Sequence, residues 1–129
     1  MVSRIQDTLE MAEITGEVVE REASGAELIS ERTCQAMRRC EAGIIVVGQA
    51  DYEMGAEGEP VLRRSTLIEI GAARVHYVRR FILLLESRLP LPFNLDDFCH
   101  LEVEGGELTW ETALRLVKSV KHFKADAGP

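Results

Sequence analysis

The sequence predicts an α/β fold in which helices cover both faces of a parallel β-sheet. Two uninterrupted apolar runs, at 43–48 and 81–85, have the length and composition of strands buried on both faces. Two helical patterns precede the first run, another separates the two runs, and a last one closes the chain. Such alternation of strands and helices is typical of a parallel sheet with crossover helices.

The first half of the chain is predicted to begin with a helix. Residues 3–13 carry apolar side chains at helical spacing, and two adjacent valines indicate a short strand over 14–20. A helix over 27–39 then leads to the strand at 43–48. The acidic stretch over 49–60, with two glycines and a closing proline, reads as a long loop of the kind that is often functional.

The second half of the chain is predicted to alternate in the same way. A helix from residue 65 or 66 to about 78 precedes the strand at 81–85. The prolines within 89–94 exclude a helix or a central strand there. Residues 100–104 alternate in polarity like a strand near the sheet edge, and Thr109 is expected to cap the last helix.

Composition limits the classes of function. The chain has 129 residues, 46% of them hydrophobic, which fits one domain over 1–124 followed by a disordered tail over 125–129. Its formal net charge of -7 argues against nucleic acid as a partner, because binding of phosphates needs clustered Lys and Arg. No apolar run is long enough to span a membrane, and no apolar signal region opens the chain, so no membrane partner and a cytoplasmic location are expected.

The cysteines and the common motifs point to no metal or cofactor site. The three cysteines lack a C-x-x-C spacing and form neither a disulfide framework nor a zinc motif. The chain has no dinucleotide-binding, Walker, zinc-protease or nucleophile-elbow motif. The remaining candidates lie where the first buried strand ends, at Gly48, Gln49 and Asp51, because open α/β sheets bind ligands beyond the carboxyl ends of their strands.

Glu69 is the candidate catalytic residue, and two interpretations of it remain open. If Ser65 or Thr66 is the N-cap, Glu69 lies in the first helical turn and completes a capping box with the backbone N–H of the cap. Alternatively, its carboxylate faces the crevice beside Ser65 and acts on a sugar. His76 recurs on the same helical face two turns later, where a packed or solvated histidine is the expectation.

An ordered set of segments over 43–123 resembles the C-terminal two-thirds of TIR-like, predicted nucleotide-binding domains. The segments are Ser65-Thr66-Leu67-Ile68-Glu69-Ile70-Gly71, the strand at 81–85, Pro92-Phe93-Asn94-Leu95-Asp96, Leu101-Glu102-Val103 and Trp110. In addition, residues 24–31 are similar to the loop and helix start that follow the second strand of these domains. The resemblance implies a three-layer, flavodoxin-like sheet. It also implies that Ser24 and Gly25 contribute to the substrate site.

The resemblance also implies a reaction. In TIR domains that cleave NAD, the glutamate at this helix position is catalytic, and only Glu69 matches it. The expected activity is therefore that of a hydrolase, an N-glycosidase that breaks the nicotinamide–ribose bond through an oxocarbenium-like transition state. NAD would be the substrate or ligand, and no separate cofactor is expected. The same region is also similar to nucleoside 2-deoxyribosyltransferases, through Asp51, Thr66, Glu69, Gly71 and Ala73, with the glutamate as nucleophile.

One feature departs from both families. They begin with a central strand that carries part of the substrate pocket, and no such strand is found before residue 14. Either the chain is truncated, or a partner supplies a strand, or the sheet is a smaller variant. Because an exposed sheet edge favours association, a homo-oligomer is expected. A catalytically silent TIR-like interaction or nucleotide-sensing module is the alternative function.

Overall fold

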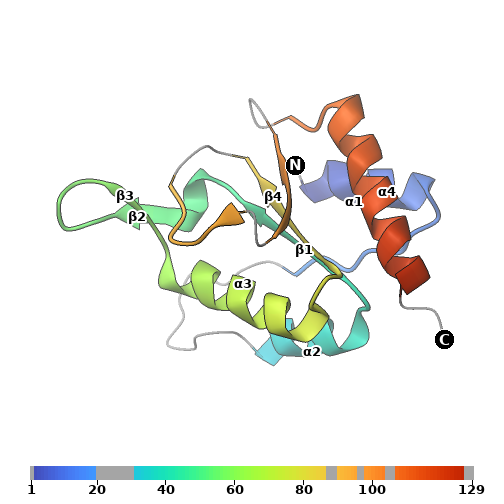
Figure 1. Ribbon diagram of the computed structural model, residues 1–129, viewed down its shortest axis with the longest axis horizontal. Coiled ribbons are helices and arrows are strands. Elements are labelled where there is room, and N and C mark those ends of the chain that lie inside the picture. Colours follow the sequence, from blue (N-terminus) through green and yellow to red (C-terminus); the bar gives the residue numbers. More distant parts are fainter. Residues whose placement is uncertain (1, 20–30, 87–89, 96–97, 104–106, 127–129) are drawn as a thin grey trace.

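The computed structural model describes residues 2–19, 31–86, 90–95, 98–103 and 107–126. Their elements are α1 (Val2–Met11), α2 (Glu31–Arg39), β1 (Gly43–Val47), the 3-10 turn η1 (Gln49–Asp51), β2 (Tyr52–Met54), β3 (Pro60–Leu62), α3 (Arg64–Tyr77), β4 (Phe81–Leu85), β5 (Cys99–Glu102) and α4 (Trp110–Asp126). The described part of the chain is thus an α/β fold with four helices, a three-stranded sheet and a small antiparallel hairpin, and the predicted α/β class is confirmed (Figure 1).

The main sheet is parallel, with the strand order β1-β4-β5. β4 is the central strand, and all five of its residues are buried, as its uniformly apolar sequence predicts. β5 lies at one edge, as predicted. Its first and last residues are exposed, and the two residues between them are half-buried. The ladder of backbone hydrogen bonds continues one residue beyond the strands. Glu86 N–H donates to Val47 O (2.9 Å), and Val103 N–H donates to Leu85 O (2.8 Å).

Two hydrophobic clusters cover the two faces of this sheet. Successive side chains of a strand point to opposite faces, so alternate residues of β4 enter different clusters. Phe81, Leu83 and Leu85 pack with α3, and Met37 of α2 joins them. Ile82 and Leu84 pack with α1 and α4 on the other face. Figure 1 shows the resulting layers, with α2 and α3 on one side of the sheet and α1 and α4 on the other.

Two predictions differ from the structure, and the predicted start of a third element lies outside the described residues. Residues 14–19 form no strand, although residue 20 lies outside the described residues. The adjacent valines there have strand propensity but no strand to pair with among the described residues, and strand propensity depends on such context. Within the described residues α2 begins at Glu31, since 27–30 are not described. Asp126 ends α4, so the first two residues of the predicted tail are helical, and 127–129 lie outside the described residues.

The predicted loop over 49–60 is instead a turn followed by a hairpin. β2 and β3 pair antiparallel, with Tyr52 opposite Leu62 and Met54 opposite Pro60. Tyr52 and Leu62 are buried in the cluster that α3 covers, and this anchors the hairpin to the body of the domain. Gly58 closes the turn with φ 82°, which glycine adopts readily. The two glycines and the proline that suggested a loop are compatible with a short hairpin at the periphery.

The end of α1 offers a simple test of backbone strain. Ile14 N–H donates to Leu9 O (2.8 Å) and Glu13 N–H donates to Glu10 O (2.9 Å), while Glu13 has φ 63°. This is a Schellman motif with a glutamate at the position that glycine favours. Glu13→Gly should raise the free energy of unfolding by about 1 kcal/mol, since it removes the penalty of a left-handed residue with a Cβ. Urea denaturation measures the change.

Glu10→Gly is the matched control for this prediction. Glu10 is exposed within the same helical turn, where glycine should lower stability by about 1 kcal/mol. If both substitutions lower the unfolding midpoint, Glu13 does not limit the stability of this turn.

Candidate active site

Asp51, the last residue of η1, hydrogen-bonds to the end of β1 and to the start of α3 at the carboxyl edge of the sheet. Its Oδ2 accepts a hydrogen bond from Gly48 N–H (2.9 Å), directly after β1. Its Oδ1 accepts a hydrogen bond from the Thr66 hydroxyl (3.0 Å), in the first turn of α3. Asp51 is 8% exposed and Thr66 is 1% exposed. Hydrogen bonds to a buried carboxylate are strong, so this cluster fixes the start of α3 to the end of β1.

α3 begins earlier than either expected cap. Its N-cap is Arg63, which has an extended backbone and makes no capping hydrogen bond from its side chain. Arg63 is held instead by its N–H to Asp51 O (2.8 Å) and by its Nε to Ala50 O (3.1 Å). Thr66 is therefore the third helical residue and Glu69 the sixth. The capping-box interpretation of Glu69 is wrong, because the hydroxyl it requires lies inside the helix and binds Asp51.

Glu69 lies in the half of α3 that is nearer the carboxyl edge. The helix runs antiparallel to β1, because Thr66 binds at the Gly48 end while Tyr77 lies against Gly43, where an added Cβ would approach the Tyr77 ring to 2.6 Å. Glu69 follows Thr66 by about one turn. Its side chain is half-buried and flanks the buried side of the helix. The carboxylate is thus at the edge where open α/β sheets bind ligands.

Glu86 is a second carboxylate at this edge that was not among the predicted site residues. It follows β4 directly, and its side chain lies over Gly48, where an added Cβ would meet Glu86 Oε2 at 2.3 Å. Glu86 is half-buried. The strand-end rule that identifies Gly48 after β1 identifies Glu86 after β4 as well, so the signal was present in the sequence. Glycine at position 48 leaves the space that the Glu86 carboxylate occupies.

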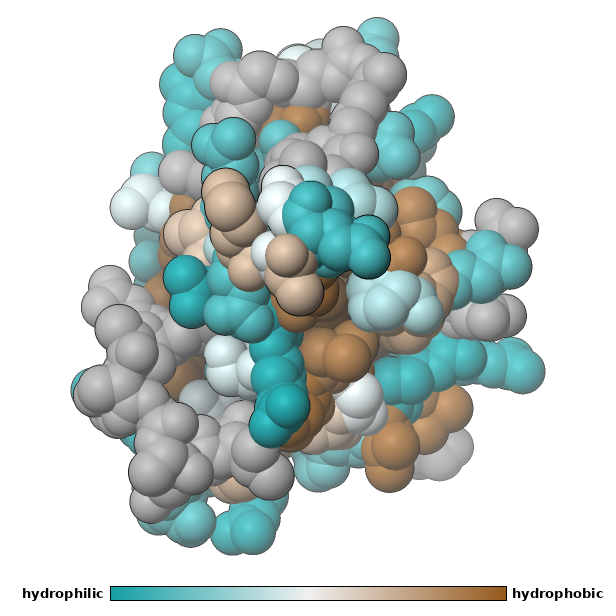
Figure 2. Space-filling model, turned by 90° about the vertical axis from the view of Figure 1, so that its left-hand side faces the viewer, coloured by the Kyte–Doolittle hydropathy of each residue, from teal (hydrophilic) through white to brown (hydrophobic). Residues whose placement is uncertain are grey.

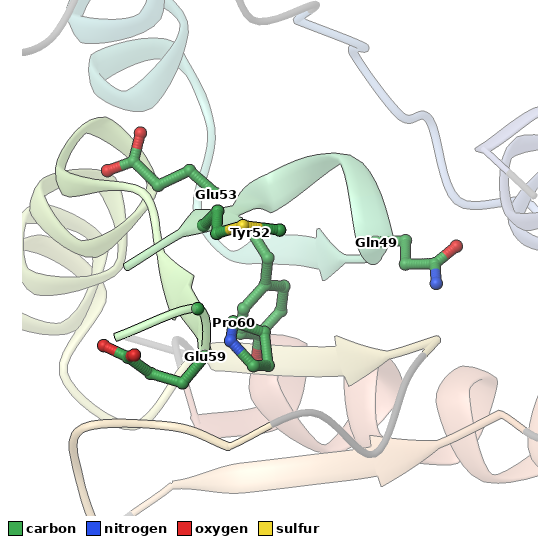
Figure 3. A pocket seen from close by; sticks show the side chains of 7 residues that line it. Gln49, Tyr52, Glu53, Glu59 and Pro60 are labelled. Carbon is green, nitrogen blue, oxygen red and sulfur yellow. The ribbon is translucent and has the colours of Figure 1, made fainter. Parts of the chain in front are cut away.

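Gln49 links this edge to a pocket in the hairpin. The pocket has a volume of about 250 Å³ and is lined by Gln49, Tyr52, Glu53, Met54, Gly58, Glu59 and Pro60. Figure 3 shows the Gln49 side chain pointing away from the other labelled side chains, which come from the two hairpin strands and their turn. Neither Glu69 nor Gly48 is among the lining residues. The pocket is therefore a neighbour of the carboxyl-edge site and not the site itself.

The other predicted residues are only partly brought together. Ser65 is exposed at the second position of α3, next to Thr66. Ser24 and Gly25 lie outside the described residues. His76 is away from the edge, with its Nε2 2.9 Å from Met37 O, and so links α3 to α2. His76 is exposed, which agrees with the expectation of a packed or solvated histidine.

Burial raises the pKa of several groups, one of which, Tyr52, directly follows Asp51. Burial raises the pKa of Tyr77 to about 12, so this phenol stays protonated as it donates to Met37 O (3.2 Å). Burial and the nearby Glu17 carboxylate raise the pKa of Cys40. Since the thiolate is the reactive form, Cys40 is a poor nucleophile at neutral pH. Glu17 itself pairs with Arg39.

The described residues contain no group of three or more His, Cys, Asp or Glu side chains arranged to hold a metal ion. None of the helices in the described part of the chain has the length and apolar character needed to cross a membrane. No family model, no curated protein and no solved structure matches this chain.

Proposed function

We propose that this chain is a TIR-like, flavodoxin-like nucleotide-binding domain that hydrolyses the nicotinamide–ribose bond of NAD, with Glu69 as its catalytic carboxylate. The observation that carries the proposal is the attachment of α3 to the end of β1 through Asp51 and Thr66. This attachment places the first half of α3, including Glu69, at the carboxyl edge of a parallel sheet. Ligands of open α/β sheets bind at such an edge.

The residues at this edge suit the proposed chemistry. When the bond between the ribose C1′ and the nicotinamide nitrogen breaks, its electron pair leaves with nicotinamide and positive charge develops on the ribose. A carboxylate held beside the ribose stabilises that charge, which is the role of Glu69. A water molecule then bonds to C1′ and gives up a proton, and Glu86, the carboxylate over Gly48, accepts it in this proposal.

A catalytically silent nucleotide-binding or interaction module is the second candidate. It is supported by the size of the sheet, which has three strands within the described residues. The families that the chain resembles have a further central strand that carries part of the substrate pocket. A sheet that lacks this strand can still bind a nucleotide at its carboxyl edge, but it does not catalyse a reaction on it. Both candidates require nucleotide binding, and they differ in turnover.

Nicotinamide release from NAD tests the proposal. The purified chain, dilute and concentrated, should release nicotinamide and ADP-ribose in equal amounts, measured by liquid chromatography over hours. Absence of release from folded protein at every concentration would contradict the hydrolase. Binding of NAD without release would then support the silent module, and base exchange on a deoxynucleoside would identify deoxyribosyl transfer instead.

A further inference from the structure

β5 presents an unpaired edge of the main sheet. It is an outer strand in the order β1-β4-β5, so in the described part of the chain only β4 pairs with it. Val103 N–H donates to Leu85 O (2.8 Å), and in a parallel ladder every second residue of a strand bonds to the same neighbour. Leu101 therefore bonds to β4 as well. The backbone groups of His100 and Glu102 point to the other side, where they form the kind of edge that pairs with a further strand.

Other exposed surfaces are less suited to a contact between molecules. β1 is the second outer strand, and Glu86 N–H donates to Val47 O, so the backbone groups of Val46 point away from β4. Val46 already has another partner. At the hairpin end Met54 is 81% exposed, but Figure 2, which looks onto this end, shows hydrophobic residues interrupted by hydrophilic ones. The edge of β5 is therefore the better interface.

The residues of β5 are complementary to a second copy of the same strand. Two copies can align their outward groups antiparallel, about a twofold axis at Glu102, at His100 or at Leu101. An axis at Glu102 places two carboxylates opposite each other, which is destabilising. An axis at His100 places Glu102 opposite Phe98, whose carbonyl oxygen already lies 3.2 Å from His100 Nδ1. An axis at Leu101 places His100 of each copy opposite Glu102 of the other, and this register leaves no such conflict.

The register centred on Leu101 uses both faces of the sheet. His100 and Glu102 lie beside Leu83 and Leu85, on the face that α3 covers. There the imidazole of one copy meets the carboxylate of the other, and each such pair exchanges two backbone hydrogen bonds. Leu101 lies on the face that α1 and α4 cover and is only half-buried. At the axis the two leucine side chains cover each other.

We propose that two copies of this chain associate through β5, paired antiparallel with Leu101 at the twofold axis. The two sheets then continue as one across the axis. The contact is isologous and uses the β5 edge of both copies, so association through it stops at the dimer. Few side chains take part, so the dimer is weak and depends on protein concentration. The contact does not require the NAD chemistry proposed above.

Sedimentation velocity over a concentration series tests this dimer. The weight-average mass should rise from the 14.4 kDa of one chain to a plateau at twice that value. His100→Lys should tighten the dimer about threefold or more, because it places opposite charges across both pairs. His100→Glu should weaken it by more than about tenfold, because it places two carboxylates across each pair. The double variant His100→Glu/Glu102→Lys should dimerise at least as well as the wild-type chain, since its charges are again opposite.

The double variant and two control substitutions separate this register from general effects. His100→Lys and His100→Glu remove the same imidazole, so a purely structural effect would shift association in the same direction in both. Gln35→Lys and Gln35→Glu add the same charges at an exposed residue of α2, and both should associate like the wild-type chain. Weaker association in both His100 variants would overturn the proposal. So would a double variant that stays monomeric, a wild-type chain that stays monomeric up to its solubility limit, or growth beyond the dimer.

Hydrogen exchange of single amides, followed by NMR, locates the contact in the chain. The amides of His100 and Glu102 should exchange more slowly as the protein concentration rises, because the dimer supplies their acceptors. In His100→Glu this dependence on concentration should disappear for the Glu102 amide. Unchanged exchange at both amides, in a sample that sediments as a dimer, would place the interface on another surface and overturn the proposal.

Discussion

Glu69→Gln is expected to reduce nicotinamide release from NAD by at least about 100-fold, the usual effect of removing one preorganised electrostatic contact to a transition state. The substitution keeps the shape of the side chain and removes only its negative charge. An amide cannot stabilise a cationic ribose as a carboxylate does. Because Glu69 is half-buried and makes no N-terminal cap, the free energy of unfolding should change by less than about 1 kcal/mol.

The measurements for this prediction are kcat/KM from initial rates and the midpoint of thermal unfolding. Glu111→Gln is the control, since it makes the same change in the first turn of α4, on the opposite face of the sheet. It should leave kcat/KM as it is in the wild-type chain and lower the free energy of unfolding by less than about 1 kcal/mol, since it removes a first-turn acid. Release that persists in Glu69→Gln at more than a tenth of the wild-type rate would assign the chemistry to another group at this edge. Glu86→Gln would then be the next variant to assay.

The sequence correctly predicts the features that depend on neighbouring residues in the chain. β4 has the predicted bounds, because each of its residues is apolar and each is buried. Thr109 caps α4 as expected, with Thr112 N–H donating to its hydroxyl (3.2 Å), because a cap is a local interaction within three residues. In both cases the residues concerned are close together in the chain.

The start of α3 was misjudged because its decisive contact is not local. Thr66 has the sequence context of an N-cap, but its hydroxyl is used by Asp51, which lies 15 residues earlier. The same contact accounts for the candidate site. Asp51 was expected to bind substrate, whereas both of its carboxylate oxygens accept hydrogen bonds from within the domain. Glu86 was overlooked because its place over Gly48 depends on the pairing of β1 with β4.

Asp51→Ala should lower the free energy of unfolding by about 3 kcal/mol. The substitution leaves two donors, Gly48 N–H and the Thr66 hydroxyl, in a buried place without their acceptor. Each unsatisfied buried donor costs about 1–3 kcal/mol, and water that enters the space recovers part of this. Asp51→Asn should cost less, because its amide oxygen still accepts one of the two hydrogen bonds. Urea denaturation of both variants gives the values.

A double-mutant cycle with Thr66→Val separates this cluster from a general loss of packing. If the hydrogen bond between Asp51 and Thr66 stabilises the start of α3, the two substitutions together should cost about 1–2 kcal/mol less than the sum of their separate effects. Additive effects would mean that the two residues contribute independently, and α3 would then be held by packing alone.

The same variants bear on Glu69, because its position depends on this attachment. With coupling present, each single variant should lower kcat for nicotinamide release even at temperatures where it is fully folded, since a helix released at its first turn no longer holds the carboxylate in place.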